Sequence, residues 1–225
     1  MRLTIFFFLI ITAISNINAQ NKTSAGVLPK TVISVKLPKN LKLVNIIELR
    51  EVFFEKTDGS DVEFNYNHKL TDISALISLK RTPYKSFALG YRMRAEGNNL
   101  SHQIIQQFSV VQNLNASRVG HRLSADQTFK SDIISYRFRY RLSFEKPLNG
   151  NKIDPNEFYI KAGTEYLMKL SDNITSSEIR AVSLLGYEIE DSNKIEIGLD
   201  YRISNFLNKI SDNAIWLNIG WYFKI

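Results

Sequence analysis

Residues 213–225 have the sequence NAIWLNIGWYFKI, in which the side chains separate by parity into two faces. The odd-numbered positions from Ile215 to Ile225 are all apolar, whereas the even-numbered positions from Trp216 to Lys224 are mixed. Strict alternation is the period of a β-strand, because successive side chains point to opposite faces. Both a soluble sheet, with its apolar face in the core, and a membrane barrel, with its apolar face in lipid, use strands of this kind.

The same alternation recurs along most of the chain. It is strongest in 134–145, where apolar and aromatic residues alternate with Arg137, Arg139 and Arg141. The other alternating segments, separated by turn residues, are 31–37, 41–56, 72–80, 87–94, 101–113, 118–129, 157–169, 178–190, 194–203 and 213–225. Together these are eleven segments, and single-chain bacterial barrels usually have an even number of strands. We therefore expect either twelve strands, if the poorly alternating residues 61–70 add one, or ten, if one N-terminal segment does not span the membrane.

One segment, 101–113, departs from strict alternation. Gln106 falls on the same side as the apolar residues Ile104 and Phe108. A β-bulge inserts one extra residue and changes the phase of a strand. We therefore expect a bulge at this position.

The first residues have the features of an export signal. Met1–Arg2 are followed by the apolar run 3–14, which is too short to span a bilayer, and Ala19–Gln20 is a suitable cleavage point. We expect a cleaved signal peptide over residues 1–19, a polar N-terminal lead over 20–30 and a single β-barrel domain over 31–225. The expected location is the bacterial outer membrane.

The composition argues against several classes of function. The chain has no cysteine and three dispersed histidines, so we expect neither a metal site nor a cofactor. The formal net charge is +7, but the basic residues occur singly at alternate strand positions instead of in tracts. This arrangement argues against nucleic acid as a partner.

Four features favour a membrane barrel over a soluble one. The alternating segments are longer than typical soluble strands. Their polar faces repeatedly carry glycine, and they use arginine beside acidic residues, as a crowded lumen with cross-strand ion pairs would. Tyrosine and tryptophan gather near strand ends on the apolar faces, as at Tyr91 and Trp221. We expect an all-β, antiparallel up-and-down transmembrane β-barrel of ten to twelve strands, with outer-membrane lipid as a partner.

The charged residues of the polar faces are the candidates for a functional site in the lumen. They are Arg92, Arg94, Arg118, Arg122, Arg137, Arg139, Arg141, Glu145, Glu165, Glu196, Asp200 and Arg202. They would either fill the lumen as ion pairs or form an anion-selective, narrow pore, since charged rings set selectivity.

The sequence contains no convincing catalytic set, and we expect no catalytic residues and no enzyme. An outer-membrane lipid acyl hydrolase would need a Ser–His pair on the lipid side, for which His121 with Ser183 or Ser117 is the candidate. The carboxylate pairs Glu145 with Glu165 and Glu196 with Asp200 could serve acid–base chemistry. Neighbouring arginines would instead keep them ionised. A soluble periplasmic ligand-binding barrel is the remaining alternative.

The chain carries several further motifs between Phe87 and its end. They are Gly90-Tyr91-Arg92, His121-Arg122-Leu123 with Asp126-Gln127 and Phe129, Tyr136 to Arg141, Gly186-Tyr187 and the terminal aromatic strand. These motifs resemble the domain of unknown function 2490 (DUF2490) family of predicted bacterial outer-membrane proteins. The family often has Arg, Glu and Arg where this chain has Ser124, Asp126 and Thr128. The resemblance implies the fold and the location and assigns no activity.

The terminal strand 213–225 is the expected closing strand and the expected signal for the barrel assembly machinery, although it ends in Ile225 where a terminal phenylalanine is common. Trp221 and Phe223 are expected in the periplasmic aromatic girdle, with Lys224 at the mouth of the lumen.

Overall fold

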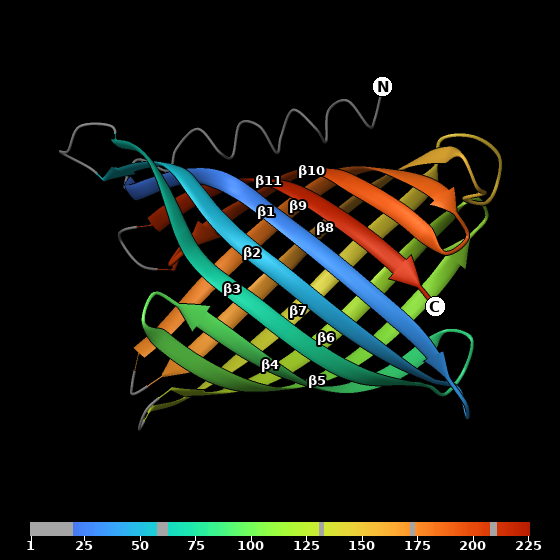
Figure 1. Cartoon of the computed structure of the whole chain (residues 1–225), viewed down its shortest axis with the longest axis horizontal. Coiled ribbons are helices and arrows are strands. Elements are labelled where there is room, and N and C mark those ends of the chain that lie inside the picture. The colour runs from blue at the N-terminus through green and yellow to red at the C-terminus, as the bar shows by residue number, and fades with distance from the viewer. Residues whose placement is uncertain (1–19, 58–62, 131–132, 172–173, 208–210) are drawn as a thin grey trace.

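The computed structural model describes residues 20–57, 63–130, 133–171, 174–207 and 211–225. Eleven strands form a single closed barrel (Figure 1). Their bounds are β1 Gln20–Leu37, β2 Leu41–Thr57, β3 Glu63–Lys80, β4 Lys85–Glu96, β5 Asn99–Leu114, β6 Ser117–Lys130, β7 Ile133–Pro147, β8 Glu157–Ser171, β9 Ile174–Glu190, β10 Asn193–Ser204 and β11 Ser211–Lys224. In the described residues, no helix has the length and apolar character needed to cross a membrane.

Consecutive strands pair antiparallel around the barrel, and the ring is closed by β1 and β11, which run parallel. Figure 1 shows these two strands side by side and pointing the same way. The expected all-β barrel of ten to twelve strands is confirmed. The expectation of an even number is wrong, because a parallel closing pair requires an odd number of alternating strands.

The expected N-terminal lead, residues 20–30, lies in the first part of β1. Its alternation is weak because Leu28 points into the barrel, where it is 1% exposed. In the other strands, most apolar side chains point outward instead. Pro29 cannot donate a backbone hydrogen bond. The pairing with β2 is continuous from Lys30 onward and omits Leu28 and Pro29. The barrel therefore begins at Gln20, not at residue 31.

Of the poorly alternating segment 61–70, residues 61 and 62 lie outside the described residues, and residues 63–70 form the first part of β3 and not an additional strand. The register between β2 and β3 shifts between Arg50 and Glu51 and again between Val52 and Phe54. Each irregularity changes which face the next side chain occupies, which explains the poor alternation.

The expected bulge at Gln106 is wrong. The pairing of β5 with both β4 and β6 runs through this residue without a shift, opposite Leu89 and Ala125. Gln106 is simply a polar residue on the exposed outer face of the barrel.

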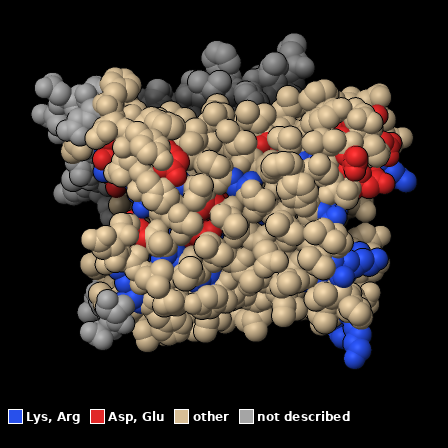
Figure 2. All heavy atoms as spheres, in the orientation of Figure 1, with Lys and Arg blue, Asp and Glu red and all other residues tan. Residues whose placement is uncertain are grey.

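Apolar side chains cover the outside of the barrel. The exposed fractions of Phe138, Ile197 and Leu217 are 51%, 45% and 38%. Figure 2 shows that uncharged residues form most of the visible face and that charged residues of both signs appear mainly toward its left and right sides. This placement is the inverse of that in a soluble ligand-binding barrel, in which these side chains would be inside. The expected signal peptide lies outside the described residues.

Candidate functional site

Two aspartates organise one ion-pair cluster in the lumen. The side chain of Asp126 is fully buried and accepts hydrogen bonds from Arg137 Nε at 2.7 Å and from an Arg139 terminal nitrogen at 3.0 Å. Asp72 is bound in a two-point fashion by Arg94, at 2.7 and 2.6 Å. Bidentate arginine–carboxylate pairs are among the stronger polar contacts in proteins. Gln103 on β5 joins the two parts, because its side-chain oxygen accepts from Arg92 and Arg137, so the cluster links β3 to β7 across their inner face.

Two glutamates on β8 and β10 organise a second group of contacts. Glu165 accepts from Arg141 Nε at 2.8 Å, and Arg180 lies 3.2 Å from its other oxygen. Glu196, which is 0% exposed, accepts from the Tyr159 hydroxyl at 2.9 Å and from Lys161 Nζ at 2.8 Å. Lys194 also lies 3.7 Å from Glu196, and Arg180 also pairs with Glu178.

Large side chains fill the lumen beside these pairs. Trp216 on β11 is 2% exposed and packs with Leu28 and Val52 in a small hydrophobic core. The guanidinium groups of Arg50 and Arg202 lie over its ring, 5.4 and 5.9 Å from the centroid. Because cations stack favourably on tryptophan faces, this arrangement holds the ring across the lumen.

Tyr159 is also fully buried, and its ring occupies the space that Gly186 leaves on β9. A Cβ atom added at Gly186 would lie 2.1 Å from the ring, so the glycine is required for this close packing. The repeated glycines of the polar faces therefore have a packing role at this position.

The structure brings most of the sequence-predicted lumen residues into ion pairs. Arg118 and Glu145 pair at 3.2 Å near one rim, where Arg118 is more than half exposed. Arg202 binds Asp200 on its own strand. Arg92 contacts Ser74 at 3.0 Å and lies 3.9 Å from Asp72. Arg122 is different, because it has no ion pair within the described residues.

Several lumen residues were missed. Asp126 is one of them; it pairs directly with the predicted residue Arg137, and counting outward from the short β6–β7 connection predicts this pair. Lys161 and Arg180 occupy polar-face positions that the alternation had already identified. Lys30 was missed because its segment was not assigned to a strand. The alternation places Trp216 on the mixed face, but no local pattern indicates that its ring packs against Leu28 and Val52.

The histidines are paired with residues other than serine. His121 Nδ1 lies 2.8 Å from the Tyr140 hydroxyl, and His102 contacts the Tyr91 hydroxyl. Ser117, one candidate partner of His121, donates its hydroxyl to the backbone oxygen of Leu114. No group of three potential metal ligands occurs in the part of the chain that the structure describes.

The candidate carboxylate pairs are each bound to their own cations. Glu145 contacts Arg118 and Glu165 contacts Arg141, while Glu196 contacts Lys161 and Asp200 contacts Arg202. A general acid needs a carboxyl group that holds its proton, and an adjacent cation favours the ionised form instead.

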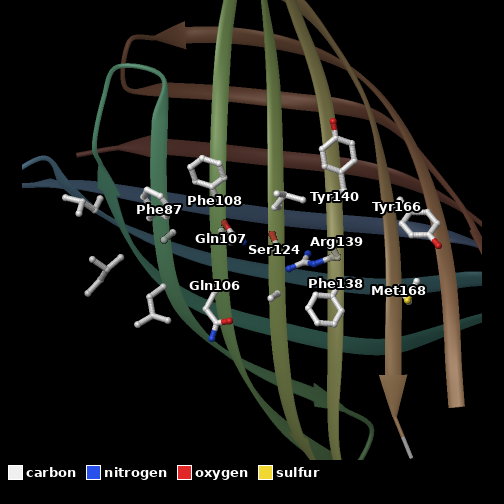
Figure 3. Close-up of a pocket in the computed structure, with 16 residues that line it drawn as sticks. Phe87, Gln106, Gln107, Phe108, Ser124, Phe138, Arg139, Tyr140, Tyr166 and Met168 are labelled. Carbon is white, nitrogen blue, oxygen red and sulfur yellow. The ribbon is translucent and has the colours of Figure 1, made fainter. Parts of the chain in front are cut away.

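A groove of about 890 Å³ lies on the outer wall over β3 to β8. In Figure 3, Gln106 and Phe138 lie at one level of this groove, and Phe108 and Tyr140 lie at the next. The β6 position between Gln106 and Phe138 carries only the small side chain of Ala125. The carboxamide of Gln106 has no hydrogen-bond partner among the described residues.

A family model described as "Protein of unknown function (DUF2490)" matches residues 31–214, most of the chain. The chain belongs to this family. The DUF2490 match begins inside β1 and ends inside β11, so it covers nearly the whole ring of strands. The resemblance inferred from the sequence motifs is thus confirmed.

No curated protein matches this DUF2490 chain. Among solved structures, it is similar to the crystal structure of the siderophore receptor PirA from Pseudomonas aeruginosa, with 16% sequence identity and a TM-score of 0.32. The match covers 76% of this chain and 33% of the receptor. The DUF2490 chain therefore spans about a third of the length of that protein.

Proposed function

We propose that this DUF2490 protein is a non-catalytic outer-membrane β-barrel whose lumen is closed by its own side chains. The observation that carries the proposal is the inverted arrangement of side chains, with apolar residues outside and buried ion pairs inside. A barrel surrounded by lipid requires this arrangement, because exposed apolar surface of this extent is unfavourable in water.

The positions of two Tyr–His pairs support a membrane-spanning belt. His102 on β5 contacts Tyr91, and Val110 of the same strand lies opposite His121, which contacts Tyr140. Eight residues along a strand span about 27 Å, or roughly 20 Å along the barrel axis at a tilt of about 40°. Amphipathic rings are favoured at both membrane interfaces. The pairs fit two interfacial girdles with an apolar band between them.

Gln106 lies midway between these two girdles, and replacing it tests the membrane environment. We expect Gln106→Leu to raise the free energy of unfolding in lipid vesicles by about 1–2 kcal/mol, because an unpaired amide is removed from hydrocarbon. The measurement is denaturant unfolding of the reconstituted protein. The control is Leu89→Gln, at the paired outer position on β4, which should lower the stability by a similar amount. A soluble barrel would gain nothing from Gln106→Leu, so an unchanged midpoint contradicts the membrane proposal.

Closure of the lumen is supported by Trp216, Tyr159 and Ile105, whose side chains are nearly or fully buried. We expect the refolded protein to give no steady ion current in planar bilayers, and Arg139→Ala serves as the comparison. A steady, anion-selective current that changes with Arg139→Ala would favour a narrow pore instead, the second candidate function.

A lipid acyl hydrolase is not favoured, because the hydrogen-bond partner of His121 is Tyr140 and not a serine. Incubation of the reconstituted protein with phospholipid tests this directly. Release of fatty acid that is lost in His121→Ala would contradict the proposal.

The proposed partners are outer-membrane lipid and the barrel assembly machinery, with no role for nucleic acid. In this proposal the machinery recognises β11, whose outer face carries Trp221 and Phe223, with ring centroids 4.5 Å apart. The signal peptide and the outer-membrane location are parts of the same proposal. Fractionation of cells that express the full chain tests them.

A further inference from the structure

Arg122 on β6 carries a positive charge that no acidic residue in the described chain neutralises. Strand pairing places it directly opposite Arg141 on β7, and the charges of Arg141 and Arg139 both act on it. The acidic group that acts on Arg122 is Glu165, but the Glu165 carboxylate already contacts Arg141 and Arg180. Like charges directly opposite each other in a sheet are destabilising. The sequence therefore maintains an unfavourable contact at this place in the lumen.

Two lysines on the opposite side of the barrel add to this charge. Lys42 on β2 lies within electrostatic range of Arg122, and Lys30 on β1 lies within range of Arg141. Neither lysine has an ion pair within the described chain, although Glu48 attracts Lys30. We call Lys30, Lys42, Arg122 and Arg141 the cationic vestibule.

Small residues line the inner face on the rim side of the cationic vestibule. Two residues nearer the rim than Arg122 and Arg141, and on the same inner face, the adjacent strands β6, β7 and β8 carry Gly120, Ser143 and Gly163. Two of these three positions have no side chain. Arg122 and Lys42 are both exposed, although their side chains point into the lumen. Water therefore reaches the vestibule from the rim at which β11 ends, which we call the C-terminal rim.

Beyond the cationic vestibule the lumen is closed. Ile105 lies on β5, four residues deeper than Ser109, the partner of Arg122, and it is 0% exposed. Leu28 on β1 and Trp216 on β11 are also buried and pack together with Val52. A ligand that enters at the C-terminal rim would be stopped here.

We propose that the cationic vestibule binds a small phosphate-bearing anion that enters from the C-terminal rim. Arginine presents its donors in a planar fork that matches phosphate oxygens, and the two lysines add point charges from the opposite wall. A multiply charged anion relieves the repulsion between Arg122 and Arg141. The inference rests on the proposed closed lumen, which makes the vestibule a binding site and not part of a conducting path.

The test is calorimetric titration of the detergent-solubilised full chain with inorganic pyrophosphate at low salt. We expect saturable binding that weakens about tenfold or more in Arg122→Gln, because one charge-assisted contact is lost. Lys42→Gln should also weaken the binding of pyrophosphate. The matched control is Arg118→Gln, because Arg118 lies on the same strand nearer the rim and is already paired with Glu145. This control should change the affinity less than about twofold, as expected for an exposed paired charge.

Absence of saturable binding, or equal weakening by Arg122→Gln and Arg118→Gln, would overturn the proposal. Arg122→Lys, which keeps the charge and loses the fork, should give an intermediate affinity and guards against a variant that fails to fold. Titration with vesicles of phosphatidic acid in phosphatidylcholine identifies the source. If both the vesicles and pyrophosphate bind in a way that depends on Arg122, the ligand is a lipid headgroup. If only pyrophosphate binds in this way, the ligand is a soluble phosphate. A conducting wild-type barrel would overturn the closed-lumen proposal and leave the binding result intact.

Discussion

Asp126→Asn is expected to lower the free energy of unfolding by about 3–5 kcal/mol, the usual cost of removing one partner from a buried ion pair. Asp126 neutralises both Arg137 and Arg139, and its carboxylate is fully buried. Asparagine has nearly the same shape, so packing is preserved and the lost negative charge accounts for the effect. The two guanidinium groups, which are 13% and 10% exposed, would then face each other without a counter-charge.

The measurement is denaturant unfolding of the reconstituted protein, followed by tryptophan fluorescence. The matched control is Glu55→Gln, which removes the partner of Lys22 in a pair whose side chains are 38% and 40% exposed. An exposed pair contributes at most about 1 kcal/mol. Equal losses in the two variants would show that Asp126 does not hold the lumen cluster together.

The alternation of side chains predicted most strands because each has one apolar face against the outside. The alternation did not predict a strand where the inner and outer faces carry similar residues. In the first half of β1, the inward Leu28 and the outward Pro29 obscure the pattern. The parallel pairing of this segment with β11 is a contact between the two ends of the chain, and no local pattern indicates it.

The kind of residue in the lumen could also be predicted, but most pairings could not. Arg137 pairs with its direct cross-strand neighbour Asp126, which register alone predicts. Glu196, by contrast, contacts Lys161 from two strands away. Such a contact depends on the curvature of the closed barrel and on which side chains reach across it. The unpaired state of Arg122 is visible only when all its neighbours are placed.

Trp216→Ala is expected to lower the free energy of unfolding by about 3–5 kcal/mol, as for other large-to-small changes in a core. The ring packs against Leu28 and Val52 and would lie 2.8 Å from a Cβ atom added at Gly26. Its removal leaves a cavity beside the closing pair β1 and β11. It also leaves Arg50 and Arg202 without the ring on which they stack.

If the lumen is closed as proposed, the same substitution should open it, because Trp216 is the largest of the fully buried side chains among the described residues. We therefore expect ion-current steps in planar bilayers for Trp216→Ala and none for the wild type. The matched control is Trp221→Ala, which removes the same side chain from the outer face, where Trp221 is 47% exposed and donates a hydrogen bond to Asn193. This control should keep the lumen closed and lose less than half as much stability. Silent bilayers for Trp216→Ala, with the fold intact, would show that the ion pairs close the lumen without the ring.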